Sequence, residues 1–363
     1  MAAPDAATLR SRRTRLRALA DGEGLGAMLI TAPANIRWLT GFTGSYGALV
    51  QLPGRDVLIT DGRYRDQAGW QAPGVEVEVA PADRIGAAAA LLEPEVTETR
   101  PAGFEPSGLL WSEGDRLREL VGAATPAPAL VEELREVKDD TELASIRAAA
   151  RAGMAALDAV LPALAPGVTE LEVARRLELA MRDAGADGVA FDSIVAFGPN
   201  AAEPHHLPTS RALARGDLVK LDFGAAVDGY RSDMTRTVVL GPASARQREV
   251  YEVVRAAQAA GLATLRDGVT GGEIDAACRD LITAAGLGEA FSHPTGHGVG
   301  LEIHEAPRVR ARAGGSIAAG TPLTVEPGVY IPGFGGVRIE DLAVVGPDGH
   351  ELLTTTTKDL LEL

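Results

Sequence analysis

The second part of the chain carries the same pattern twice, and this duplication limits the folds that the chain can adopt. Each copy has Gly-Val-Thr and a glutamate three residues after the threonine: Thr169 with Glu172 and, 101 residues later, Thr270 with Glu273. This spacing is typical of a capping box, in which two side chains satisfy free backbone groups at the start of a helix. An Ala-Gly pair closes each segment, as a helix stop would. The pattern predicts two related helices.

Each expected helix is followed by histidines and then by a segment that is typical of a β-hairpin. The first copy continues into His205-His206 and LVKLDFGAAVDGYRSDMTRTVVL, and the second into HPTGHGVGLEIHE and LTVEPGVYIPGFGGVRIEDLAVV. An Asp-Gly pair supplies the turn in the first segment, and Pro-Gly and Gly-Gly pairs supply it in the second. We therefore expect an α/β domain with internal pseudo-twofold symmetry, in which the two hairpins face each other.

The first part of the chain has a different pattern, in which strand and helix signals alternate. GAMLIT and DVLITD are rich in branched apolar residues, as strands are, whereas RYRDQAGWQA and DRIGAAAALL are typical of helices. A length of 363 residues suits two domains. We expect a small α/β domain over residues 1–133 and the pseudo-symmetric domain over residues 134–363.

Composition excludes several classes of protein. The formal net charge of −15 argues against nucleic acid and anionic membranes as partners. The sequence has no run of about 18 apolar residues, so no membrane span is expected, and its N-terminus lacks the apolar segment of a signal peptide. The single cysteine, Cys278, excludes an intrachain disulfide framework and a cysteine-rich zinc site. We expect a cytoplasmic protein.

The hairpins hold the residues that carry chemistry, because each places two acids opposite, or nearly opposite, each other. Asp222 and Asp233 lie at almost equal distances from the first turn, and Glu326 and Glu340 at equal distances from the second. Direct cross-strand partners have Cβ atoms about 5 Å apart. Apolar neighbours indicate a strand interior, and we expect the nearest lysine, Lys220, on the opposite face of its strand.

Four acids in such a place need protons or cations. Two carboxylates about 4 Å apart repel by roughly 4 kcal/mol at an effective dielectric constant of about 20. Four carboxylates balance two divalent ions, and one histidine would complete a site for Mn²⁺, Co²⁺ or Fe²⁺, with Zn²⁺ as a further candidate. Two ions about 3.5–4 Å apart can bridge a water molecule, lower its pKa and clamp a tetrahedral intermediate. These residues therefore predict metal-assisted hydrolysis.

The same stretches resemble the pita-bread metallopeptidases, and most closely their Xaa-Pro peptidase branch, aminopeptidase P and prolidase. The resemblance covers essentially the whole chain and rests on LDFGAAVDGYRSDMTRT, HPTGHGVGLEIHE, TVEPGVY and GGVRIED. It implies a creatinase-like N-terminal domain before a pita-bread catalytic domain. It also implies hydrolysis of the Xaa-Pro bond, in dipeptides or at the N-terminus of peptides, by a hydroxide that bridges two metal ions, with Mn²⁺ expected.

The resemblance implies a role for each matching position. The metal ligands would be Asp222, Asp233, His297, Glu326 and Glu340. Glu326 would also handle the proton of the nucleophile, and His205 and His304 would act in catalysis. His293 and Arg338 would bind the substrate, a peptide with proline at its second position.

Other interpretations stay open at this point. A methionine aminopeptidase-like enzyme fits poorly with the large N-terminal domain and with Arg338. A non-catalytic pita-bread binding module would lack the metal ligands that this chain keeps. Within the Xaa-Pro branch, aminopeptidase P and prolidase are nearly balanced. A homodimer is the assembly that the resemblance implies, and His206 receives no role from it.

Overall fold

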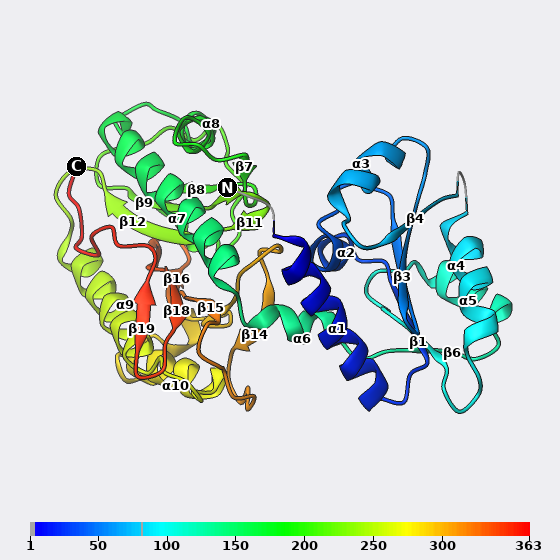
Figure 1. Ribbon diagram of the computed structural model, residues 1–363. Helices are drawn as coiled ribbons and strands as arrows, with labels where there is room; N and C mark the ends of the chain where they lie inside the picture. The colour runs from blue at the N-terminus through cyan, green and yellow to red at the C-terminus, as the bar shows by residue number, and fades with distance from the viewer. Residues whose placement is uncertain (1–3, 81–82) are drawn as a thin grey trace. The chain divides into compact units, whose positions relative to one another are not determined.

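The computed structural model describes residues 4–80 and 83–363, and the chain divides into two compact units between Arg135 and Glu136 (Figure 1). The α/β fold class that the sequence predicts is confirmed in both units. In the described parts of the chain, no helix is long and apolar enough to cross a membrane.

The first unit is a six-stranded sheet in the order β4-β3-β2-β1-β5-β6, with helices packed against it. Its elements are α1 (Ala6–Gly22), β1 (Ala27–Ile30), α2 (Pro33–Thr40), β2 (Ala48–Leu52), β3 (Arg55–Thr60), α3 (Arg65–Gln71), β4 (Glu76–Val79), α4 (Arg84–Leu92), β5 (Ala102–Phe104), α5 (Trp111–Leu120), β6 (Ala124–Pro126) and α6 (Leu130–Glu136). The expected strands GAMLIT and DVLITD are β1 and β3, and the expected helices are α3 and α4. Branched residues of β1 to β3 and one face of α4 form its core.

The second unit is built from two similar halves. Its helices are α7 (Asp140–Val160), α8 (Glu170–Asp183), α9 (Ala245–Ala263) and α10 (Gly271–Ala284). Its strands are β7 (Gly188–Val189), β8 (Ile194–Phe197), β9 (Leu218–Phe223), β10 (Ala225–Val227), β11 (Tyr230–Arg231), β12 (Met234–Val239), β13 (Gly296–Gly298), β14 (Glu305–Val309), β15 (Pro322–Val325), β16 (Gly328–Ile331), β17 (Gly335–Arg338), β18 (Asp341–Val345) and β19 (His350–Leu352). Helices α7 and α8 share an apolar core with β8, β9 and β12, and α9 and α10 share another with β15 to β18. Each half therefore has its own apolar core, in line with the duplication that the sequence predicts.

The helix starts behave as the repeated motif predicts. The Thr169 hydroxyl accepts a hydrogen bond from the Glu172 N–H at 3.2 Å, and the Glu172 carboxylate accepts one from the Thr169 N–H at 2.8 Å. Thr270 and Glu273 repeat both bonds at the same distances. Both capping boxes are therefore confirmed, at the first turns of α8 and α10.

The register of the two hairpins places the acids. Val325 pairs with Asp341 and Gly328 with Arg338, so Glu326 and Glu340 lie across from each other, as predicted. In the first hairpin the acids are nearly opposite rather than directly opposite, because Asp222 pairs with Thr235, two positions beyond Asp233. Asp233 is therefore a diagonal neighbour of Asp222, on the same face of the ladder and within reach of it.

We predict that Thr270→Ala lowers the free energy of unfolding by about 1 kcal/mol, because the N-cap of α10 is lost. Thr283→Ala is a matched control in the same helix, since the exposed Thr283 hydroxyl bonds, among the described residues, only back to the Arg279 carbonyl. Urea unfolding of both variants measures the difference. Equal midpoints for the two variants would contradict the role of the cap.

Candidate metal centre

The five predicted ligand residues line one cavity of about 320 Å³ in the second unit. They come from both halves: two acids from the hairpin of β9 to β12, and His297 with two acids from β13 and the hairpin of β15 to β18. Single ligand atoms of Asp233, His297 and Glu340 lie within 4.8 Å of one another. The Nε2 atom of His297 is 3.5 Å from Asp233 Oδ2 and 3.4 Å from Glu326 Oε1. The donor set is therefore assembled around a common space.

The electrostatics of this group fit a site for cations. Burial, followed by repulsion from neighbouring carboxylates, raises the pKa values of Asp233 and Glu340 well above their usual range. Burial also raises the pKa of Glu326 to about 7. Oδ1 of Asp222 and Oδ1 of Asp233 are buried and accept no hydrogen bond from any described residue. Buried acceptors without donors are costly, and divalent cations between the hairpins would satisfy them.

His297 is prepared to act as a ligand. Burial lowers its pKa to about 4, so the ring is neutral near pH 7. With Nδ1 as the donor to the Gly298 carbonyl at 3.0 Å, Nε2 keeps a lone pair directed at the acids. The flanking glycines are required by packing, because a Cβ on Gly296 would lie 2.0 Å from the Thr324 carbonyl oxygen. A Cβ on Gly298 would lie 2.0 Å from the Ala306 carbonyl oxygen. GHG can thus occupy the narrow space between β14 and β15.

Arg338 connects one of the acids to His293 through the Tyr330 hydroxyl. Its Nη2 forms an ion pair with Asp222, and its Nη1 donates to the Tyr330 hydroxyl at 2.6 Å. The Tyr330 hydroxyl lies 2.8 Å from His293 Nε2, and Nδ1 of His293 is 2.7 Å from the Pro294 carbonyl oxygen. Burial lowers the pKa of His293 to about 3, so the ring is neutral and Nε2 accepts from Tyr330. His293 and Arg338, predicted separately, belong to one chain of hydrogen bonds.

Two features of this region differ from the sequence interpretation. Tyr330 received no role, although strand alternation from Gly328, the partner of Arg338, places it on the Arg338 side. The expectation that Lys220 faces away from the acids is wrong, because residues two apart along β9 share a face. Its ammonium lies 5.0 Å from the centre of the Tyr330 ring, and burial lowers its pKa to about 6.

His205 and His304 both line the cavity, and both side chains are exposed. The ring of His304 lies edge-on to that of His297, with 4.4 Å between ring centres. The two exposed histidines, one from each half, are therefore available to a molecule in the cavity.

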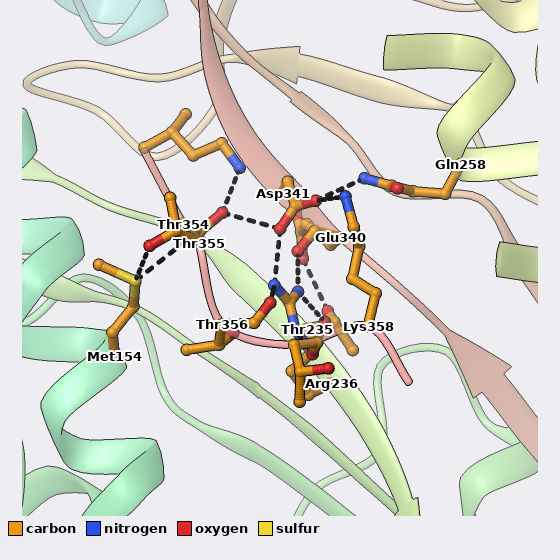
Figure 2. A network of polar contacts seen from close by, with 12 residues as sticks. Met154, Thr235, Arg236, Gln258, Glu340, Asp341, Thr354, Thr355, Thr356 and Lys358 are labelled. Atoms are coloured by element: carbon orange, nitrogen blue, oxygen red, sulfur yellow. Dashed lines mark hydrogen bonds and ion pairs between the residues drawn. The ribbon is translucent and has the colours of Figure 1, made fainter. Parts of the chain in front are cut away.

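A buried polar network supports Glu340 from behind (Figure 2). The Thr235 hydroxyl donates to Glu340 Oε2 at 2.6 Å. The guanidinium of Arg236 binds the backbone carbonyls of Thr235 at 3.0 Å and of Glu340 at 2.6 Å, and it pairs with Asp341 at 2.7 Å. Burial acts to raise the pKa of Asp341, but Arg236 and Lys358 hold it below its ordinary value. This ion pair joins β12 to β18, and so joins the two hairpins that carry the acids.

We predict that Asp233→Asn lowers the amount of metal bound and the rise in melting temperature on adding Mn²⁺. The metal-free variant should keep the melting temperature of the wild type or exceed it, because one repulsive carboxylate is gone. Asp228→Asn in the turn of the same hairpin is the control, since asparagine tolerates its φ of 49°. Undiminished metal binding in Asp233→Asn, measured by elemental analysis and thermal unfolding, would contradict the proposed ligand.

A second prediction concerns pH. The folded, metal-free chain holds protons on Glu326, Asp233 and Glu340 more tightly than the unfolded chain, because their pKa values are raised. The stability from Glu326 is therefore present below the ordinary pKa of 4.5 and is lost as the pH rises through about 7. Added Mn²⁺ should raise the melting temperature more at a pH of about 7.5 than at about 5. A metal-induced shift that is equal at both pH values would count against the carboxylate site.

Comparisons with known proteins agree with this architecture. Residues 144–347 match the family model "Metallopeptidase family M24", and residues 12–137 match "Creatinase/Prolidase N-terminal domain". The chain is 40% identical over 351 residues to "Uncharacterized peptidase YqhT" of Bacillus subtilis, covering 96% of this chain and 99% of that protein. It is 33% identical over 360 residues to an Xaa-Pro dipeptidase of Pyrococcus furiosus, with 97% and 100% covered.

Solved structures show the same similarity. The structure of an Xaa-Pro dipeptidase from Bacillus anthracis matches with a TM-score of 0.94 and 40% identity, covering 98% of this chain and 100% of that one. An X-Pro aminopeptidase from Thermotoga maritima matches with a TM-score of 0.88 and 34% identity, with 97% and 99% covered. The predicted fold, a creatinase-type N-terminal domain before a pita-bread catalytic domain, is confirmed, and the chain belongs to metallopeptidase family M24.

Proposed function

We propose that this protein is an Xaa-Pro dipeptidase that works with two divalent metal ions, with Mn²⁺ expected. The observation that carries the proposal is the convergence of four carboxylates, three buried and one partly buried, and a neutral imidazole on one cavity that also holds two exposed histidines. The proposed metal ligands are Asp222, Asp233, His297, Glu326 and Glu340.

The cavity suits a short peptide that contains proline. Beside the polar groups, its walls include the apolar side chains of Phe191, Ile194, Leu207 and Ile303. Apolar walls match the proline ring, and the Xaa-Pro nitrogen has no N–H that would need an acceptor. The names of the similar B. anthracis and P. furiosus proteins favour the dipeptidase over the aminopeptidase.

The proposed division of labour follows from position. Divalent ions held here would act as Lewis acids toward the scissile carbonyl and lower the pKa of a water molecule. Glu326 would accept the proton of the attacking water on its carboxylate. His205 and His304 would orient the peptide from the exposed side of the cavity, and Arg338 would hold Asp222 in place through its ion pair.

The other interpretations lose support. A methionine aminopeptidase-like enzyme has no need of the creatinase/prolidase-type domain matched by residues 12–137. A non-catalytic module has no need of a complete set of ligand-type side chains around one cavity. A homodimer, a cytoplasmic location and the identity of the metal stay predictions.

The test is product analysis of the Mn²⁺-loaded protein given Ala-Pro and Ala-Pro-Ala side by side. The proposal predicts free proline from Ala-Pro and little or no release of alanine from Ala-Pro-Ala. Rapid release of the N-terminal alanine from the tripeptide would establish an aminopeptidase instead. Failure to cleave either peptide, with metal bound, would contradict the proposed substrate class.

A further inference from the structure

His206, which received no role from the sequence, is buried next to His205 and is held by two carboxylates. The side chain is 6% exposed, and both ring nitrogens lie near carboxylates. Nε2 is 2.9 Å from Glu170 Oε2, and Nδ1 is 2.6 Å from Glu203 Oε2. The two carboxylates differ, because the side chain of Glu170 is 0% exposed and that of Glu203 is 67% exposed. The buried contact is therefore the one screened from water.

Glu170 forms hydrogen bonds along the loop of residues 197–209, which carries His205. Besides His206, its carboxylate accepts hydrogen bonds from the Phe197 N–H at 2.8 Å, from Asn200 Nδ2 at 2.9 Å, and from the N–H and hydroxyl of Thr209 at 2.9 and 2.6 Å. Glu170 is the first residue of α8, where the helix N-terminus favours a negative charge. One buried carboxylate thus holds both ends of the loop and the residue next to His205.

The chain is also held on the other side of His205. Lys220 donates to the carbonyls of Glu203 and Pro204, and Arg338 donates to the Pro204 carbonyl at 3.2 Å. His205 is therefore flanked by anchored residues while its own side chain is exposed in the cavity.

The second half of the unit repeats this arrangement. Glu305 follows the exposed His304, as His206 follows His205, and it is buried. Its carboxylate pairs with the buried Lys138 at 2.9 Å and accepts a hydrogen bond from the Glu302 N–H at 3.0 Å. In both halves, a buried ionisable residue that is fixed to the scaffold comes directly after a histidine of the cavity.

We propose that His206 and Glu170 are positioning residues, which affect the reaction by fixing where His205 lies in the cavity. The inference rests on the proposed function. Displacing a substrate-contacting group by about 1 Å can lower the rate about 100-fold, so a loop that carries such a group gains from a rigid anchor. A purely structural role would instead reduce activity regardless of whether His205 is present.

A double-mutant cycle with Ala-Pro as substrate tests this proposal. His206→Leu leaves Glu170 its four other donors, so the variant is expected to fold and to bind metal normally. We expect kcat/KM to fall about 10-fold in His206→Leu. Glu203→Gln, which alters only the exposed partner, should change it less than about twofold. In the His205→Ala background, adding His206→Leu should have almost no further effect, because the group that it positions is already absent.

In the kinetic test, an unchanged kcat/KM in His206→Leu, or an equal further loss with and without His205, would overturn the proposal. Hydrogen–deuterium exchange of residues 198–210 tests the anchor without substrate. Exchange should be faster in His206→Leu and unchanged in Glu203→Gln, and equal exchange in all three proteins would refute the anchor. A wild-type protein that cleaves neither peptide would instead refute the proposed function, while the exchange measurement would still decide whether the anchor exists.

Discussion

Repulsion among four carboxylates, three of them buried and one partly buried, is the constraint on which the rest of the second unit depends. Asp222, Asp233, Glu326 and Glu340 lie around one cavity, where burial raises the pKa values of at least three of them. Without a cation or a rigid scaffold, neighbouring carboxylates would move apart or stay protonated. Two hairpins hold them together, and Arg338, which forms an ion pair with Asp222, also acts to lower the pKa values of the other three acids. A divalent cation among these groups would favour their ionised forms, which makes the group a candidate cation site.

The supporting structure can be understood as the means of keeping these charges in place. Each half has its own apolar core beneath its hairpin. The ion pair of Arg236 with Asp341 ties one hairpin to the other on the side away from the acids. Polar anchors then fix the exposed histidines, through Glu170 in the first half and through Lys138 in the second. The first copy therefore supplies two of the five proposed ligands and the second copy supplies three, and each copy adds one anchored loop and one exposed histidine.

Much of this arrangement could be predicted from the sequence because it depends on local chemistry. Capping boxes and turn residues act within a few positions, so the helix starts and the opposition of Glu326 and Glu340 followed from spacing alone. Asp222 and Asp233 are not direct partners, because the ladder is centred between Asp228 and Gly229 and pairs Asp222 with Thr235, two positions beyond Asp233. The contacts of Arg338 with Asp222 and of His206 with Glu170 join segments far apart in the sequence. No pattern in the chain encodes such distances.

Anomalous diffraction from crystals grown with Mn²⁺ would test the central claim most directly, because it locates the metal without depending on turnover. The account predicts two neighbouring peaks between the hairpins, with Asp233 and Glu340 close to both and His297 close to one. A chain that takes up Mn²⁺ elsewhere, or that leaves the space among the four carboxylates without a peak at neutral pH, would contradict it.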